Sequence, residues 1–193
     1  VPSHGGPGFE YRGRESKLHS FVFISDDEGE TWRLSDNTMT APGRGAHEPS
    51  IVELNNGELL CFVRTTNRCI YRSYSKDEGV TWSTPEPTQL QAPDSPPLLR
   101  RIPSTGDLLC IWNNVPSDTN QPRTPLSVAI SKDEGETWGD FKDIDTTHAH
   151  AEYASAYFSD ADELFVAYYA RVRADATDTD IPLKVYEVSQ LYE

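Results

Sequence analysis

Short apolar runs separated by polar turns recur along the whole chain. Residues 21–24, 59–63, 108–112 and 164–169 are runs of four to six consecutive apolar side chains, and residues 126–130 alternate apolar with small side chains. Runs of this length, rich in β-branched and aromatic residues and bounded by Gly, Pro, Asn or Asp, are typical of β-strands. No segment shows a convincing helical period. The pattern therefore predicts an all-β protein built from short strands.

An eight-residue motif occurs three times. The segments SDDEGETW, SKDEGVTW and SKDEGETW occupy residues 25–32, 75–82 and 131–138, and they begin 50 and 56 residues apart. Each follows a predicted strand and suits a tight turn. The Ser and Asp side chains can bond nearby backbone N–H groups, Gly tolerates positive φ, and Trp can anchor the turn. A calcium loop is a poor alternative, because the ligand spacing of an EF-hand is missing. The spacing is typical of β-propeller blades.

A second repeat lies between the copies of this motif. Residues 48–63, 95–112 and 152–169 each have the pattern strand, turn, strand. Each blade therefore has the order strand A, strand B, strand C, turn motif, strand D. In the first blade, strand C is expected at about 19–24, but only glycine-rich and polar residues stand where strands A and B should be. The last strand is expected at 183–191.

Counted in this way, residues 1–193 form one partial propeller domain of about three and a half blades that begins inside a blade. Three and a half blades cannot close a ring, and an open propeller exposes strand edges. We therefore expect an upstream segment, or a second chain, to complete the ring.

Composition narrows the possible partners. The formal net charge of −14 argues against binding to nucleic acid or to an anionic membrane surface, since both need basic clusters. No stretch of about 18 apolar residues is present, so no membrane segment is expected. Cys61, Cys69 and Cys110 lack zinc spacing, and the first and last lie in apolar runs. Cys61 and Cys110 are expected to be buried thiols, with a disulfide or a reactive thiol as the alternative. The compartment stays open, with a secreted or extracytoplasmic location favoured.

With these motifs the sequence resembles the sialidase (neuraminidase) superfamily over nearly its whole length. The eight-residue motif is similar to the Asp box (BNR repeat) of that superfamily. The segment from Glu48 to Arg64 resembles the family segment in which a glutamate is followed by V-E-L-x-x-G-x-L, a strand and an arginine. Arg123, upstream of an Asp box, is similar to the last active-site arginine, and Tyr153 to the nucleophilic tyrosine. The resemblance implies the C-terminal part of a six-bladed propeller.

The resemblance also implies roles for these four residues. Arg64 and Arg123 would bind the carboxylate of sialic acid bidentately, as planar guanidinium groups do. Tyr153 would be the nucleophile and Glu48 its base, a tyrosine nucleophile being the recognised exception of sialidases among glycoside hydrolases. A phenol approaches the anionic sugar without the repulsion that a carboxylate would meet. On residue chemistry alone, Tyr153 could instead be a core aromatic side chain and the charged residues ordinary surface groups.

The sequence offers weaker evidence for other candidate site residues. His47 could contact substrate, although loop histidines are more often incidental. His148 and His150 indicate a metal site only weakly, so no metal or cofactor is expected. Two family parts are missing, namely the first arginine of an R-I-P motif and the acid/base aspartate. Arg101 is followed by Ile and Pro, but the repeat alignment puts it at the end of strand A, so we interpret this match as coincidence.

The function favoured by this resemblance is a retaining exo-sialidase, or a hydrolase of a related acidic sugar, acting on sialylated or acidic glycans. With half of the catalytic set, the isolated chain is expected to bind weakly and turn over little. Two alternatives remain, because fold does not fix function. One is an enzyme that degrades another acidic polysaccharide, and the other is a propeller that binds carbohydrate or acts as a scaffold without catalysis.

Overall fold

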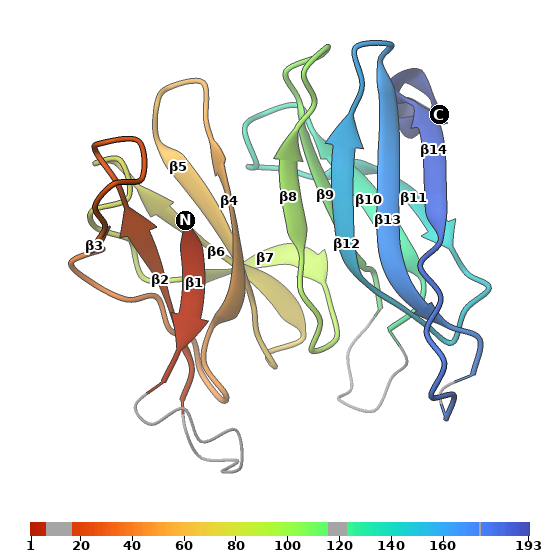
Figure 1. Cartoon of the computed structure of the whole chain (residues 1–193), viewed down its shortest axis with the longest axis horizontal. Coiled ribbons are helices and arrows are strands. Elements are labelled where there is room, and N and C mark those ends of the chain that lie inside the picture. The colour runs from red at the N-terminus through yellow and green to blue at the C-terminus, as the bar shows by residue number, and fades with distance from the viewer. Residues whose placement is uncertain (7–16, 116–122, 174) are drawn as a thin grey trace.

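A computed structural model describes residues 1–6, 17–115, 123–173 and 175–193. Its strands form four antiparallel sheets that follow the chain order (Figure 1). The first sheet contains β1 (Pro2–Gly5), β2 (His19–Ile24) and β3 (Arg33–Leu34). The second contains β4 (His47–Glu53), β5 (Leu59–Arg64), β6 (Cys69–Ser75) and β7 (Glu86–Gln91). The third contains β8 (Leu98–Arg101), β9 (Leu108–Asn113), β10 (Leu126–Ser131) and β11 (Gly139–Asp145). The fourth contains β12 (His150–Phe158), β13 (Glu163–Arg171) and β14 (Leu183–Glu187).

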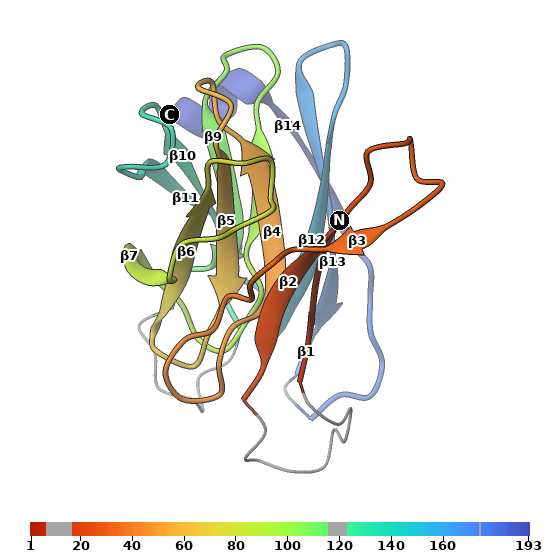
Figure 2. The same ribbon diagram turned by 90° about the vertical axis from the view of Figure 1, so that its left-hand side faces the viewer.

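The sheets stand beside one another as the blades of a propeller do, which confirms the predicted all-β architecture. Figure 2, seen from the side of the first sheet, shows most of the strands lying roughly along one axis, with β3 running across it. Apolar side chains fill the spaces between neighbouring sheets. Trp138, for example, packs with Leu60 and Phe62 between the second and third sheets, and Trp82 packs with Val22 between the first and second. Burial between successive sheets is the main apolar driving force.

The Asp boxes form the predicted turns between strands C and D. In the second box, the Ser75 hydroxyl donates to Asp77 Oδ1 at 2.8 Å and accepts from the Gly79 amide at 2.8 Å. Asp77 accepts from the amide and the hydroxyl of Thr81 at 2.8 and 2.6 Å. Gly79 has a φ of 91°, a conformation that is strained for any residue with a Cβ. The Trp82 indole donates to the Gly79 carbonyl at 3.0 Å. The turn thus satisfies its own polar groups.

Strand register places the Asp boxes and the starts of strand A at opposite edges of the sheets. Ser75, where the second box begins, pairs with Leu59 at the start of β5. Arg64, at the other end of β5, pairs with His47 at the start of β4. We call the edge at which strand A begins the mouth edge and the opposite one the box edge.

Two sequence expectations about strands were wrong. Pro2–Gly5 forms β1, which pairs with β2 from Pro2 opposite Val22 to Gly5 opposite His19, so a strand B does precede the first box. Its pattern of Pro, Ser, His and Gly hides it, because backbone pairing and not side-chain burial holds it. The predicted last strand ends at Glu187, and Val188–Tyr192 is a 3₁₀-helix. Val188 and Leu191, three residues apart, both face the interior as that geometry requires.

The structure also bears on the expected state of the cysteines and on the expected lack of a membrane segment. Cys61 and Cys110 are fully buried, and all three cysteines are free thiols. Burial raises the pKa of both buried thiols, which makes them inert. Among the residues that the structure describes, no helix is long and apolar enough to cross a membrane.

Candidate active site

The second and fourth sheets each begin strand A with a bulge at a polar residue. In β4 the pairing with β5 slips between His47 and Ser50, and Glu48 has a φ of 49°. In β12 the pairing with β13 slips between Glu152 and Ser155, and Tyr153 has a φ of 55°. Non-glycine residues rarely adopt this conformation, and β-bulges re-aim side chains. The two bulges turn Glu48 and Tyr153 toward each other.

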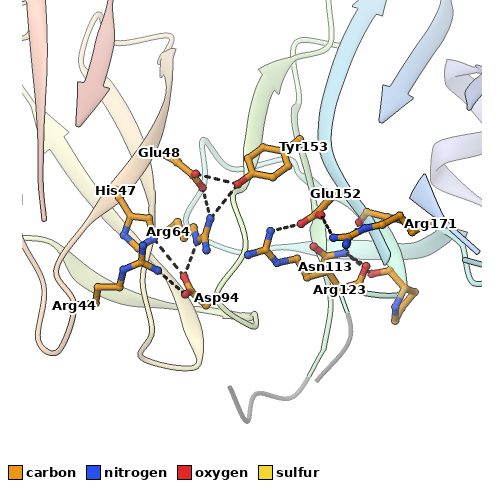
Figure 3. Close-up of polar contacts among 12 residues, drawn as sticks. Arg44, His47, Glu48, Arg64, Asp94, Asn113, Arg123, Glu152, Tyr153 and Arg171 are labelled. Atoms are coloured by element: carbon orange, nitrogen blue, oxygen red, sulfur yellow. Dashed lines mark hydrogen bonds and ion pairs between the residues drawn. The ribbon is translucent and has the colours of Figure 1, made fainter. Parts of the chain in front are cut away.

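Glu48, Tyr153 and Arg64 form one hydrogen-bonded cluster at the mouth edge (Figure 3). The Tyr153 hydroxyl donates to Glu48 Oε1 at 3.2 Å, across 105 residues of sequence. Arg64 Nη1 donates to Glu48 Oε2 at 2.6 Å and lies 3.5 Å from the Tyr153 hydroxyl. Arg64 is 5% exposed, whereas Tyr153 is 45% exposed. A solvent-accessible phenol therefore sits between a carboxylate that can accept its proton and a fixed cation.

Asp94 holds the other side of Arg64. Its Oδ1 accepts from Arg64 Nε at 2.5 Å, and its Oδ2 accepts from Arg44 Nη1 at 2.9 Å. His47 Nε2 lies 3.3 Å from Oδ1. Burial opposes ionisation of Asp94, but the contacts with His47 and Arg64 outweigh burial and hold its pKa well below the usual range. Burial lowers the pKa of Arg64, but its contacts with Asp94 and Glu48 outweigh burial and raise this pKa. Arg64 thus stays charged and fixed.

Arg123 lies beside Tyr153 but pairs with Glu152. Arg123 Nη1 forms an ion pair with Glu152 Oε2, and Arg171 Nη2 lies 3.1 Å from Oε1 of the same carboxylate. The Arg123 guanidinium lies 5.9 Å from the centre of the Tyr153 ring, close enough for a cation–π interaction. Glu152 is 8% exposed. Arg123 is therefore held next to the phenol without touching Glu48.

These side chains together carry a small positive excess. Four arginines face three carboxylates, which leaves one net positive charge: Arg44, Arg64, Arg123 and Arg171 against Glu48, Asp94 and Glu152. A protein with a net charge of −14 thus collects a local arginine group suited to an anionic ligand.

The structure places the remaining sequence candidates away from the phenol. His47 is 2% exposed and lies against Asp94, so it presents no open surface to a substrate. Arg101 lies at the box edge, where its guanidinium bonds Glu134 at 2.9 Å. His148 Nδ1 lies 2.5 Å from Asp145 Oδ2. Within the described ranges, no three His, Cys, Asp or Glu side chains are placed to hold a metal ion.

Sequence reasoning missed several residues at the mouth edge. Asp94 and Arg44 lie in loops, where the strand pattern gives no orientation. Glu152 carried a usable signal, because it precedes Tyr153 at the bulge of β12 as His47 precedes Glu48 at the bulge of β4. In this alignment of the blades Tyr169 takes the position of Arg64, so the register gave no signal for Arg171.

Comparison with known proteins identifies the family. Residues 2–166 match the family model described as BNR repeat-like domain. The chain belongs to this family. Over 65 residues it is 38% identical to the anhydrosialidase of Macrobdella decora. This aligned segment is 34% of this chain and 8% of that protein.

Solved sialidases share the fold of this family member. The Hadza microbial sialidase Hz136 superimposes with a TM-score of 0.71 at 20% identity, over 90% of this chain and 33% of that one. The K499G mutant of NanB sialidase from Streptococcus pneumoniae gives a TM-score of 0.65 at 22% identity, over 79% and 24%. The chain thus spans less than half the length of each of these proteins. These matches show that the chain shares the β-propeller fold of these sialidases.

Proposed function

We propose that this chain contributes the nucleophile, its base and two carboxylate-binding arginines to a retaining exo-sialidase acting on terminal sialic acid or a related acidic sugar. The single observation that carries this proposal is the Tyr153–Glu48–Arg64 cluster, in which a phenol hydroxyl lies 3.2 Å from a carboxylate. A phenol alone is a weak nucleophile at neutral pH, and a neighbouring base activates it.

The reaction proceeds in two displacements at the anomeric carbon. Arg64 and Arg123 orient the substrate carboxylate, and the Tyr153 oxygen attacks as its proton passes to Glu48. The bond to the leaving alcohol breaks, and this alcohol takes a proton from a separate acid group. Water then attacks the sugar and gives a proton back to the separate acid group, and the bond to Tyr153 breaks as the phenol regains its proton from Glu48. Two inversions give net retention.

The ion pairs at the mouth edge fit this order of events. Arg123 and Arg171 both pair with Glu152. Arg123 can therefore turn to a substrate carboxylate while Arg171 still neutralises Glu152. Arg64, clamped from two sides, loses little rotamer freedom on binding. Preorganised cations of this kind stabilise anionic groups without reorganisation.

We further propose that additional propeller sheets of the same polypeptide, or a second chain, cover the two outer sheets. Trp82 and Trp138, in the second and third Asp boxes, are 4% and 5% exposed because each packs on the preceding sheet. Trp32, the same residue of the first box, is 51% exposed. The fourth sheet likewise exposes Tyr157 at 66% and Leu183 at 61%. Quenching of Trp32 fluorescence by iodide should be weaker in the longest natural polypeptide that contains this chain. Equal quenching there would contradict the proposal.

The test of the enzymatic proposal is hydrolysis of a fluorogenic sialoside by that longest polypeptide, followed by rapid acid quenching and mass spectrometry. A retaining mechanism predicts a sialosyl adduct on the peptide that contains Tyr153, and a Glu48→Gln variant should lose about 10²–10⁴-fold in kcat. Absence of hydrolysis by the folded wild type, or full activity of the Glu48→Gln variant, would reject it.

A second candidate is a propeller that binds acidic carbohydrate without catalysis. The observation that favours it is the excess of one positive charge among the four arginines and three carboxylates of the mouth edge, which can hold an anion without any catalytic step. Binding on a glycan array, with no turnover and no adduct on Tyr153, would select this candidate.

A further inference from the structure

Asn113 connects the two segments that carry Arg123 and Tyr153. This residue ends β9 and is 1% exposed. Its side-chain Nδ2 lies within hydrogen-bonding distance of three backbone carbonyl oxygens: 2.9 Å from Arg123, 3.1 Å from Pro125 and 2.8 Å from Ala151. Figure 3 shows Asn113 close to Arg123 and Glu152, between the third and fourth sheets. One buried amide therefore holds a loop of the third sheet against the start of the fourth.

A backbone bond completes this connection. The Ala151 amide donates to the Arg123 carbonyl at 2.8 Å, so the two segments also bond each other directly. Ala151 is followed by Glu152, which pairs with Arg123, and then by Tyr153 at the bulge. Any shift of the Arg123 loop away from β12 must break both the Asn113 contacts and this amide bond.

The repeat shows that Asn113 stands where another sheet has an active-site candidate. Arg64 follows Cys61 by three residues at the end of β5, and Asn113 follows Cys110 by three residues at the end of β9. The arginine reaches sideways to the Glu48 carboxylate, whereas the shorter amide stays within its own interface and binds carbonyls. The last position of strand B thus holds a charged residue, Arg64, in the second sheet and a neutral amide that links two segments, Asn113, in the third.

The chemistry of the three partners explains why an amide is suited to this position. All three are carbonyl acceptors, and a buried carbonyl without a donor destabilises the fold. The NH₂ group of Asn supplies two donors without a charge, so it neither titrates nor competes with Glu152 for Arg123. An apolar side chain would remove this donor from the Pro125 and Ala151 carbonyls and leave the Arg123 carbonyl with the Ala151 amide alone, and a carboxylate would repel all three.

We propose that Asn113 is a positioning residue that fixes Arg123 relative to Tyr153. The sugar-processing part of this inference rests on the proposed sialidase function, whereas the structural part does not. Substrate orientation of this kind is sensitive to small displacements, and a misplacement of about 1 Å can cost about 10²-fold in rate.

The test compares Asn113→Ala with Asn37→Ala in the full polypeptide. Asn37 is a matched control at the box edge, where its side chain joins the first sheet to the second by donating to the Trp82 carbonyl at 2.8 Å and accepting from the Trp82 amide at 2.9 Å. The first readout is hydrogen exchange at the Ala151 amide. The second is kcat and KM for a fluorogenic sialoside and for its carboxyl methyl ester, which lacks the anion that Arg123 would bind.

Asn113→Ala should speed exchange at Ala151 by about 10-fold or more, since a less braced segment opens more often. It should lower kcat/KM for the free acid by about 10²-fold with a raised KM, and change KM for the ester little. Asn37→Ala should change none of these values. If Asn113→Ala fails to fold, Asn113→Ser, which keeps one donor, should show the same effects at smaller size.

Two results would overturn the inference: unchanged Ala151 exchange in a folded Asn113 variant, or equal kinetic losses in the Asn37 control. If the wild-type protein hydrolyses neither substrate, the proposed function fails, and exchange at Ala151 still decides whether Asn113 holds the two segments together.

Discussion

The two edges of the sheets differ in how they use polar residues. At the box edge nearly the same eight residues occur three times, and the Ser and Asp side chains that shape each turn bond within it, as Ser131 does with Asp133 and Gly135 at 2.8 Å. At the mouth edge the residues differ from sheet to sheet, and their bonds cross between sheets, as from Tyr153 to Glu48. The repeated edge serves the fold, and the varied edge is the candidate for chemistry.

Backbone conformation separates the edges in the same way. In the Asp boxes positive φ recurs at Glu28, Glu78 and Glu134, each followed by a glycine, because the turn requires it. At the mouth edge Arg68 has positive φ in a turn, whereas Glu48 and Tyr153 have it within strands, each at a bulge. Strain that recurs with a turn is structural, whereas strain that aims two side chains at each other points to function.

The largest expected effect is that of Tyr153→Phe. It removes the hydroxyl that we propose as the nucleophile, so kcat for a fluorogenic sialoside should fall by about 10⁴-fold or more. Because the ring stays and the residue is 45% exposed, the free energy of unfolding should change by less than about 0.5 kcal/mol. Retained activity, or a large loss of stability, would erase the functional distinction between the edges.

The second effect concerns the box edge alone. Trp82→Ala empties a site in the apolar layer between the first and second sheets, where Trp82 is 4% exposed. It should lower the free energy of unfolding by about 3–5 kcal/mol. Trp32→Ala, at a 51% exposed site of the isolated chain, should cost less than about 1 kcal/mol. Urea unfolding of both variants measures the difference. Similar losses would mean that these turns are anchored without a neighbouring sheet.

A third prediction separates the edges by pH. Asp94 has a pKa below its ordinary value, so its ionised form stabilises the fold above the unfolded pKa of about 4, and this contribution is lost as pH falls toward the folded pKa. In Asp94→Asn, the unfolding free energy should therefore depend less on pH below about 4, by up to about 1.4 kcal/mol per pH unit. Urea titrations at several acidic pH values test this. Parallel curves for wild type and variant would contradict it.

At the box edge, the pKa of Asp77 is also lowered, but by the hydroxyl and the amide of Thr81 and not by cations. Added salt should therefore weaken the Asp94 contribution more than that of Asp77, since salt screens charges and leaves neutral donors unaffected. If salt changes the stability difference between wild type and variant equally for Asp94→Asn and Asp77→Asn, the two carboxylates do not differ in their dependence on charged partners.

The smallest expected effect is that of Ser131→Ala. Its buried hydroxyl makes two hydrogen bonds in the third Asp box, and its loss should cost about 1 kcal/mol of unfolding free energy with no change in kcat. The matched variant Ser25→Ala, in the exposed first box, should cost less because water can replace the lost partner. A change in kcat with Ser131→Ala would connect the box edge to the reaction.

The sequence by itself determined the features that depend on neighbours along the chain. The Asp boxes follow from side chains that bond amides two to four residues away, as in Gly79 to Ser75 and Thr81 to Asp77. The main strands follow from apolar runs such as 59–63 and 108–112, and their order from the repeat. β1 was missed because its residues carry no such pattern, and its place depends on pairing with β2 and contact with β4.

The tertiary structure decided which side chains meet. Resemblance named Glu48, Arg64, Arg123 and Tyr153, but only the arrangement of the sheets shows that Arg64 is held by Asp94, 30 residues away, and that Arg123 shares Glu152 with Arg171. These ion pairs join loops and strand ends from different sheets, so no local pattern encodes them. Their geometry follows from apolar packing between sheets, which fixes where each strand begins in space.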